Sequence, residues 1–386
     1  MAEATGERIR LGMVGGGIGA FIGGVHRIAA RIDGDYDLVA GALSSTPEKA
    51  RESGRALGLA EDRSYGDFAA MAASEAARPD GIEAVAIVTP NHMHAPAARE
   101  FLARGIHVIC DKPLTATLEE AKALAEIAAR SDALFVLTHN YTGYPMVRQA
   151  RAMVRDGLLG EIRLVQAEYA QDWMTEPQED KGNKQAEWRV DPAKSGAGGA
   201  TGDIGTHAFN LACFVSGLTL AELAADLQHF VPGRRLDDNA NVLLRFEGGA
   251  RGMLWASQVA PGNQNSLRLR VYGSKGGLEW AQEDPNYLWY TPLGESKRLI
   301  SRSAAGAGPE AARVSRVPGG HPEGYLEGFA TIYVEAARAI RAHRAGEPIP
   351  EEVVYPTIAD GVAGVAFVEA CVRSSAANGA WVGLAI

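Results

Sequence analysis

The chain has 386 residues, 46% of them hydrophobic and 22% charged, and its formal net charge is −9. This length predicts two domains or three, and the composition predicts a folded core rather than a disordered chain. The acidic balance argues against a nucleic-acid partner, which would need clustered basic residues, and no apolar run approaches the roughly 18 residues that span a membrane.

The first 140 residues alternate short apolar strands with alanine-rich helical segments. The strands lack polar alternation, as expected where both faces of a sheet are buried. They are expected at 8–14, 36–43, 82–89, 106–110 and 134–138, with helices at 47–57, 67–77, 95–104 and 118–130. This order predicts an α/β domain over residues 1–140, built on a doubly wound parallel sheet.

A glycine-rich turn follows the first strand and opens a helix. Its sequence, Gly15-Gly16-Gly17-Ile18-Gly19-Ala20, matches G-x-G-x-x-[GA] at Gly15, Gly17 and Ala20. Such a turn allows positive φ and a close approach of the backbone to a pyrophosphate at the helix N-terminus. A generic strand-to-helix turn is the alternative, but the surrounding strand and helices favour dinucleotide binding.

The end of the second strand bears on the choice of cofactor. NAD enzymes usually place an acidic residue there, and this chain has Ser44 and Ser45, with Lys49 further along. NAD is favoured, because the 2′-phosphate of NADP would need a basic residue nearer the strand end, but NADP stays open.

The second half, residues 141–386, is expected to form an α+β domain with a large, mostly antiparallel sheet. Short turns join its strands, with no helix between most of them. We expect the strands at 161–170, 239–248, 251–260, 266–274, 276–283 and 286–292, helices at 145–156, 203–216, 323–344 and 355–375, and long loops at 175–199 and 301–320.

Polar motifs follow the parallel strands, where open α/β sheets place their ligands. They are TPNHMHA (89–95), CDKPL (110–114) and HNY (139–141). In the second half, GDIGTH (202–207) places Asp203 and His207 four residues apart, on one side of a helix that starts near Thr201.

Together these segments resemble the Gfo/Idh/MocA family of NAD(P)-dependent oxidoreductases, which includes glucose–fructose oxidoreductase and the inositol dehydrogenases. The glycine turn followed by His26, the motifs above and GSKGGLEW (273–280) carry the resemblance over nearly the whole chain. The family's Glu-Lys-Pro motif is here Asp111-Lys112-Pro113. The resemblance implies a Rossmann domain, followed by an α/β domain whose open sheet forms a homodimer or homotetramer interface.

Oxidation of a carbinol by a nicotinamide needs a base for the hydroxyl proton and a cation near the oxygen. His207 is the candidate base, since the ordinary pKa of histidine is about 6.5. Asp203 would bond His207 or the substrate hydroxyl and fix its orientation. Lys112 would donate to the reacting oxygen and contact the nicotinamide ribose. Whether Lys112 or His207 takes the proton stays open. The structural alternatives are that His207 is a helix histidine with its hydrogen bonds satisfied and that Lys112 is a solvated surface lysine.

Further residues complete the predicted site. The cofactor set is Gly15, Gly17, Ile18, Gly19, Ala20, Ser44, Ser45, Lys49, Thr89, Pro90, Asn91, His94, Asp111, Lys112 and Asn140. The substrate set is Tyr144, Gln171, Trp173, Arg189, His207 and His321.

No metal is expected, because the His92 and His94 pair lacks a supporting cluster of acidic or cysteine ligands. Cys110 is expected to be a small buried side chain rather than a nucleophile. The odd number of cysteines and the absence of a basic-then-apolar N-terminal segment predict a reduced, cytoplasmic protein without a secretory signal.

The sequence therefore predicts a dehydrogenase that oxidises a ring hydroxyl of a sugar, a sugar derivative or an inositol-like polyol. Two alternatives stay open. One is an enzyme that cleaves glycosides through an internal redox cycle on tightly held NAD, and the other is a non-catalytic sensor of cofactor or sugar.

Overall fold

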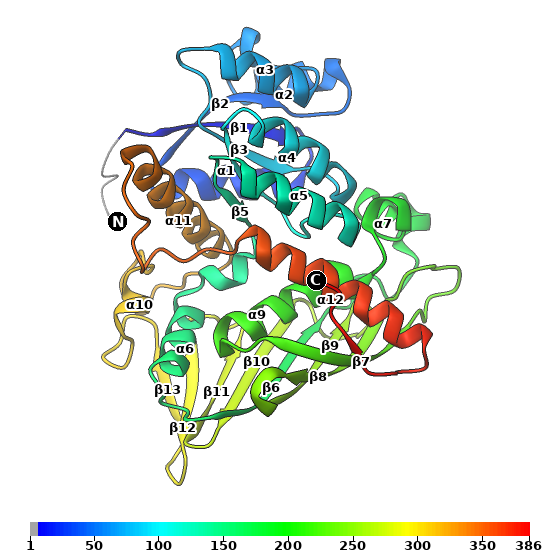
Figure 1. Ribbon diagram of the computed structural model, residues 1–386, viewed down its shortest axis with the longest axis vertical. Coiled ribbons are helices and arrows are strands. Elements are labelled where there is room, and N and C mark those ends of the chain that lie inside the picture. The colour runs from blue at the N-terminus through cyan, green and yellow to red at the C-terminus, as the bar shows by residue number, and fades with distance from the viewer. Residues whose placement is uncertain (1–6) are drawn as a thin grey trace. The chain divides into compact units, whose positions relative to one another are not determined.

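The computed structural model describes residues 7–386. Residues 1–6 lie outside the described part. They hold most of the N-terminal segment on which the prediction about a secretory signal rests. The chain divides into two compact units (Figure 1). Among the described residues, the first unit contains 7–115, 119–143 and 325–362, and the second contains 116–118, 144–324 and 363–386.

The first unit is built on a five-stranded parallel sheet in the order β2-β1-β3-β4-β5. The strands are β1 (Ile9–Gly15), β2 (Tyr36–Ala42), β3 (Ala84–Val88), β4 (His107–Cys110) and β5 (Phe135–Leu137). The helices between them are α1 (Phe21–Ile32), α2 (Pro47–Ala56), α3 (Phe68–Ala77), α4 (His94–Leu102) and α5 (Leu118–Arg130). The prediction of a doubly wound parallel sheet is confirmed.

A helix from late in the chain belongs to this first unit. The long helix α11 (Tyr325–Ala345) buries Phe329, Tyr333 and Ile340 in one core with Val25 of α1 and strand β1. The sequence prediction placed residues 325–362 in the second domain. The structure differs because the apolar stripe of α11 packs against α1, a contact between segments about 300 residues apart that no local pattern reveals.

The second unit is built on a nine-stranded sheet in the order β13-β12-β11-β10-β6-β9-β8-β7-β14. Its strands are β6 (Ile162–Ala170), β7 (Leu220–Gln228), β8 (Asn239–Phe246), β9 (Arg251–Ser257), β10 (Ser266–Gly273), β11 (Gly276–Ala281), β12 (Tyr287–Pro292), β13 (Arg298–Ser301) and β14 (Val382–Gly383). All neighbouring strands are antiparallel except β6 and β9. This confirms the predicted large, mostly antiparallel sheet.

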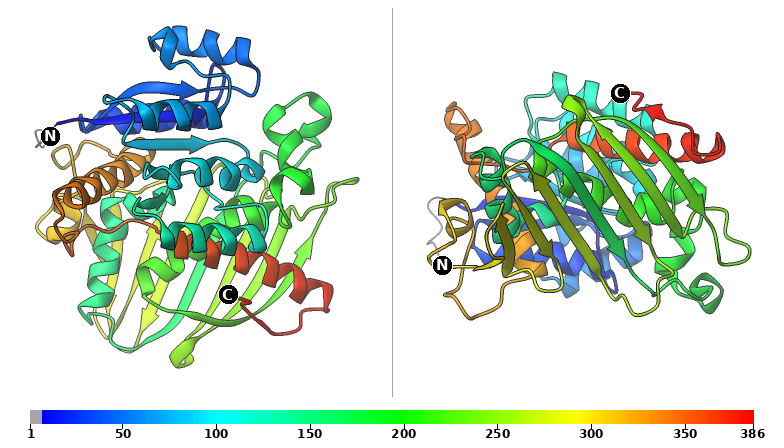
Figure 2. Two further views of the ribbon diagram at one scale, coloured as in Figure 1. Left: turned by 45° about the horizontal axis from the view of Figure 1, so that its top comes forward. Right: turned by 90° about the horizontal axis from the view of Figure 1, so that it is seen from below.

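Helices α6 (Pro145–Arg155) and α9 (Thr206–Ser216) pack on one face of this sheet. Val165, Ala167 and Tyr169 of β6 are buried on that face, as the two-residue period of a strand requires. Seen from below in Figure 2, the opposite face carries no helix of this unit. It exposes Leu243 and Met253 among its side chains.

The two segments predicted as long loops contain short helices. They are α7 (Lys184–Arg189) and α8 (Pro192–Ser195) in the first segment and α10 (Pro309–Ala312) in the second, while α12 (Ile358–Ala376) comes near the end of the chain. Across residues 7–386, every helix is too short or too polar to span a bilayer.

Candidate active site

The glycine turn after β1 has the backbone that phosphate binding requires. Gly16 and Gly19 have φ values of 70° and 81°, in the left-handed region that favours glycine. Gly17 lies so close to the next turn that an added Cβ would come within 2.5 Å of the Leu43 carbonyl oxygen. The turn therefore favours glycine at these positions.

The turn leads directly into α1, whose N-terminus has no competing anion. Ala20 precedes the helix without a side-chain cap, and the first turn contains no acidic residue. Arg27 of the same helix donates to the Gly16 carbonyl oxygen and so holds the turn in place. The backbone N–H groups of a helix start attract a phosphate, so this segment fits the pyrophosphate of a dinucleotide.

A second glycine contact holds α1 against the turn. An added Cβ on Gly23 would lie 2.4 Å from both the Cα and the carbonyl oxygen of Gly16. Gly23 therefore performs the close helix–strand packing expected of the last glycine in this kind of turn. The sequence motif assigned that place to Ala20, three residues earlier.

The remaining predicted cofactor residues lie where the parallel strands end. Ser44, Ser45 and Lys49 follow β2, with Ser45 and Lys49 exposed. The residues after β3 are Thr89, Pro90 and Asn91, and Asn140 begins the turn after β5. Because carboxyl ends of parallel strands share one edge, the structure brings these residues to the edge that carries the glycine turn.

Asp111 follows β4 and fixes the turn that carries Lys112. Its Oδ1 accepts hydrogen bonds from the Lys112 N–H at 2.9 Å and from Thr138 Oγ1 at 3.0 Å, and His26 Nε2 lies 3.9 Å away. Burial opposes the charge of Asp111, but His26 and Lys112 outweigh it and hold the pKa of this carboxyl well below its usual range. The carboxylate is therefore ionised and anchored.

His26 extends this network into the core. Its Nδ1 lies 2.8 Å from the Tyr333 hydroxyl, and Tyr36 Oη donates to the Tyr333 carbonyl oxygen at 2.9 Å. Burial raises the pKa of Tyr333, so its hydroxyl stays protonated. Helix α11 thus contributes to the turn at Lys112 through a buried chain of polar groups.

His94, which the sequence predicts as a cofactor contact, lies between two backbone carbonyl groups. Its Nδ1 lies 2.8 Å from the Pro113 carbonyl oxygen and its Nε2 lies 2.8 Å from the Thr89 carbonyl oxygen. Burial lowers the pKa of His94, so the neutral ring donates a hydrogen bond to one of these two oxygens. The side chain joins the turns after β3 and β4, and so positions residues around it.

In the second unit, Asp203 and His207 lie on one continuous helical segment. A π-helical turn (Thr201–Gly205) leads into α9. Asp237 anchors its start, because its carboxylate accepts from Gly199 N, Thr201 N and Thr201 Oγ1, each at 2.7 Å. These bonds satisfy amide groups that a helix start would leave without partners.

Asp203 is held by two donors from different elements. Arg189 Nε of α7 and Gln258 Nε2, just after β9, each donate to its Oδ2 at 2.9 Å. The remaining contacts of the Arg189 guanidinium include the carbonyl oxygen and side chain of Gln185 and the ring of Trp188, whose centre lies 4.3 Å away. The Nε and Nη1 groups of Arg189 are therefore bonded to protein groups.

A chain of side-chain amides continues from Asp203 along the end of the sheet. Gln171 Oε1 accepts from Trp173 Nε1 at 2.9 Å and lies 3.5 Å from Gln258 Nε2. Gln171 Nε2 donates to Asn265 Oδ1 at 2.8 Å, which also accepts from Tyr169 Oη at 2.7 Å. We call this series of bonds, from Asp203 to Asn265, the amide chain.

The structure thus brings together most of the predicted substrate residues. Gln171, Trp173 and Arg189 join Asp203 through the amide chain, and the His207 ring lies 6.2 Å from that of Tyr169. Sequence analysis missed Gln258, Asn265 and Tyr169. The sequence signal that could have identified Gln258 is its position, one residue beyond the end of β9.

Tyr144 and His321 lie elsewhere in this unit. Tyr144 is 1% exposed and packs against Trp280, with ring centres 5.5 Å apart, and its hydroxyl accepts from Gln282 Nε2 at 3.4 Å. His321 is exposed in the loop before α11, where its carbonyl oxygen accepts from Arg302.

Within residues 7–386, no group of three or more histidine, cysteine or acidic side chains is arranged to hold a metal ion. Cys110 and Cys371 are buried free thiols. Burial raises the pKa of the Cys110 thiol, which agrees with its prediction as an inert small side chain.

Two sequence families match this chain. Residues 9–139 match the oxidoreductase family with an NAD-binding Rossmann fold, and residues 147–279 match the GFO/IDH/MocA C-terminal domain. The chain belongs to the Gfo/Idh/MocA family of oxidoreductases. Its first unit is therefore an NAD-binding Rossmann domain, as the glycine turn predicts.

Solved structures and curated relatives cover nearly the whole chain. An oxidoreductase from Sinorhizobium meliloti is 65% identical, with 98% of this chain and 100% of that chain covered and a TM-score of 0.90. An inositol dehydrogenase homologue from Azotobacter vinelandii, solved with NADH and myo-inositol, is 38% identical, with 99% of each chain covered and a TM-score of 0.92. A levoglucosan dehydrogenase from Pseudarthrobacter phenanthrenivorans is 28% identical, covering 97% of this chain and 98% of the relative.

The contact between Gly23 and Gly16 gives a matched pair of tests. Gly23→Ala places a methyl group against backbone and should destabilise the protein by about 1–3 kcal/mol, the usual range for overpacking. It should also weaken NADH binding, because the turn at Gly16 must move. Gly24→Ala, whose Cβ would meet only Arg27 Nη2 at 4.0 Å, should instead stabilise the helix slightly. Urea unfolding and NADH fluorescence titration measure both effects, and equal behaviour of the two variants would contradict the account.

Proposed function

We propose that this protein is a dehydrogenase that transfers a hydride from a ring hydroxyl carbon of a sugar or cyclic polyol to NAD. The observation that carries the proposal is the pairing of Asp203 and His207 on one helical segment, tied to a row of polar side chains at the end of the large sheet. Family membership and the NAD-binding domain agree with it.

The residues of the first unit fit the cofactor. The amide groups of the glycine turn and of the α1 N-terminus would hold the pyrophosphate, and Ser44 and Ser45 would face the adenosine ribose. Lys112 would contact the nicotinamide ribose. Bound NAD supplies the hydride acceptor.

The chain's own residues would handle the proton and the substrate oxygen. We propose that Lys112 donates to the reacting hydroxyl oxygen, that His207 accepts its proton and that Asp203 orients His207. The substrate carbon loses a hydride and its oxygen loses a proton, so the products are a ketone or lactone, NADH and one proton. Asp203 is suited to orientation because Arg189 and Gln258 fix its carboxylate.

The chemistry around Asp203 supports a neutral, hydroxyl-rich substrate. Asp203 and Gln185 already use the Nε and Nη1 groups of Arg189, which argues against bidentate recognition of a substrate carboxylate. Amide side chains both donate and accept, as hydroxyl groups do, and Trp173 offers a flat apolar face. Solved relatives bind myo-inositol and levoglucosan, which are neutral rings of this kind.

Substitution of the two proton-handling candidates tests the proposal. His207→Asn and Lys112→Met should each lower kcat by at least about a hundredfold, the usual scale for general acid–base catalysis, while the Kd of NADH changes little in His207→Asn. Reduction of NAD by purified protein is followed by absorbance against a panel of inositols, hexoses and anhydrosugars. Full activity in both variants would overturn the assigned roles. Tight NAD binding with no reduction by any compound would favour an internal redox cycle or a sensor.

The proposal includes a second copy of the chain on the open face of the large sheet and a cytoplasmic setting. Leu164, Leu243 and Met253 are between 48% and 54% exposed on that face, and apolar surface of this kind favours a protein partner. Sedimentation analysis should give a dimer or tetramer, and a monomer at micromolar concentration would contradict this part.

A further inference from the structure

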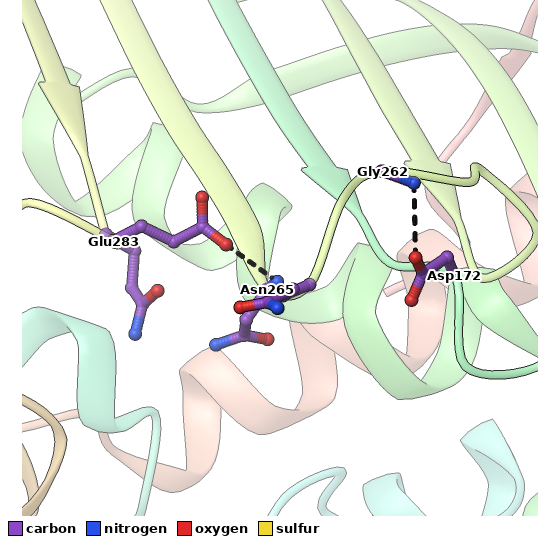
Figure 3. A pocket seen from close by; sticks show the side chains of 6 residues that line it. Asp172, Gly262, Asn265 and Glu283 are labelled. Atoms are coloured by element: carbon purple, nitrogen blue, oxygen red, sulfur yellow. Dashed lines mark hydrogen bonds between the residues drawn. The ribbon is translucent and has the colours of Figure 1, made fainter.

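A polar pocket of about 640 Å³ lies in the second unit, beyond the end of the amide chain. Two carboxylates, three amides and a glycine line it (Figure 3). These residues are Asp172, Glu283, Gln264, Asn265, Gln282 and Gly262. None of the lining side chains is aliphatic or aromatic, which distinguishes the pocket from an ordinary apolar ligand cleft.

The pocket occupies the same end of the sheet as the Asp203 network. Strands β6, β9 and β11 end here and β10 begins here, because Ala170 of β6 pairs with Ser257 of β9 and with Ser266 of β10. Gln258 follows β9, and Gln282 follows β11, three strands away in the order β11-β10-β6-β9. At about 4.8 Å per strand the two side chains start roughly 14 Å apart, which is longer than a single six-membered ring.

Asn265 connects the pocket to the amide chain. Its side chain lines the pocket and accepts from Gln171, which neighbours Gln258, a donor to Asp203. A ring held near Asp203 and His207 would therefore have its far side toward this pocket.

The acceptors in the pocket are fixed in place. Asp172 Oδ2 accepts from Gly262 N at 3.1 Å, and Glu283 Oε1 accepts from Asn265 N at 2.9 Å (Figure 3). Neither carboxylate has a basic nitrogen within 4 Å among residues 7–386. The Oε1 atom of Gln282 is buried there without a hydrogen-bond donor. The pocket thus presents more acceptors than donors, and a ligand rich in hydroxyl groups would supply the missing donors.

We propose that this pocket is a subsite for a second hydroxylated ring, so that the preferred substrate is a disaccharide or a glycoside of a cyclic polyol. The inference rests on the proposed function, since oxidation would occur on the ring near Asp203 and His207. The pocket would bind the attached sugar through its hydroxyl groups and raise kcat/KM for the two-ring compound above that for the single ring.

Paired substrates and pocket variants test the subsite. The pairs are myo-inositol with a galactosyl-inositol, and glucose with maltose, cellobiose and gentiobiose. Gln264→Trp would fill the pocket from an exposed position, and Glu283→Gln would remove a charge while keeping an acceptor for Asn265 N. Asp284→Asn, an exposed neighbour outside the pocket lining, is the matched control.

We expect the ratio of kcat/KM for a two-ring compound to that for its single ring to fall about tenfold or more in Gln264→Trp, and less in Glu283→Gln. It should not change in Asp284→Asn. Oxidation of single rings with an unchanged ratio in all variants would overturn the subsite and leave the proposed function standing.

Calorimetric titration of the NAD-loaded protein with the same disaccharides tests the subsite separately from the proposed function. If no compound is oxidised but a disaccharide binds and Gln264→Trp weakens its binding, the proposed function fails and the subsite stands. If no disaccharide binds more tightly than its single ring, the subsite is overturned.

Discussion

The turn that carries Lys112 depends on one mostly buried, ionised carboxylate, that of Asp111. A charge without partners would be unstable in this core, so Asp111 is tolerated only because a backbone N–H, the Thr138 hydroxyl and His26 surround it. The surrounding groups come from β4, from the end of β5 and from α1, and Tyr333 of α11 supports His26. The same requirement therefore joins the glycine-turn helix, two strand ends and a late helix around the residue proposed to hold the reacting oxygen.

In the second unit, hydrogen-bond donors also hold carboxylates in place, and amide groups supply many of these donors. Asp237 satisfies the start of the helical segment, and Asp203 then accepts from Arg189 and Gln258. Because each amide both donates and accepts, the series can continue from one strand end to the next and reach Asn265. Such a series of amide groups suits the proposed hydroxyl-rich substrate, and two of the three guanidinium nitrogens of Arg189 are already bonded to protein groups. The network therefore bears on the kind of substrate as well as on the position of Asp203.

Local patterns predicted much of this arrangement. The glycine turn, the polar residues after parallel strands and the four-residue spacing of Asp203 and His207 depend on short stretches of chain, and the structure shows each of them in its expected element. The misses depend on distant contacts. Strand β7, with the sequence LAELAADLQ, contains residues that favour helices and becomes a strand by pairing with β8. The packing of α11 on α1, the contacts of the His94 ring with two backbone carbonyl oxygens and the burial of Tyr144 likewise arise only in the folded chain.

The central claim, that a hydride leaves a ring carbon for NAD, is tested most directly by isotope transfer. A panel of ring polyols and glycosides carrying deuterium on each carbinol carbon in turn is incubated with the enzyme and NAD, and the recovered cofactor is analysed by mass spectrometry. The account predicts that one labelled position, and one only, transfers a single deuterium to the cofactor as the matching ketone or lactone forms. Deuterium that stays with the carbohydrate at every position, or cleavage of a glycoside with no net NADH, would contradict it.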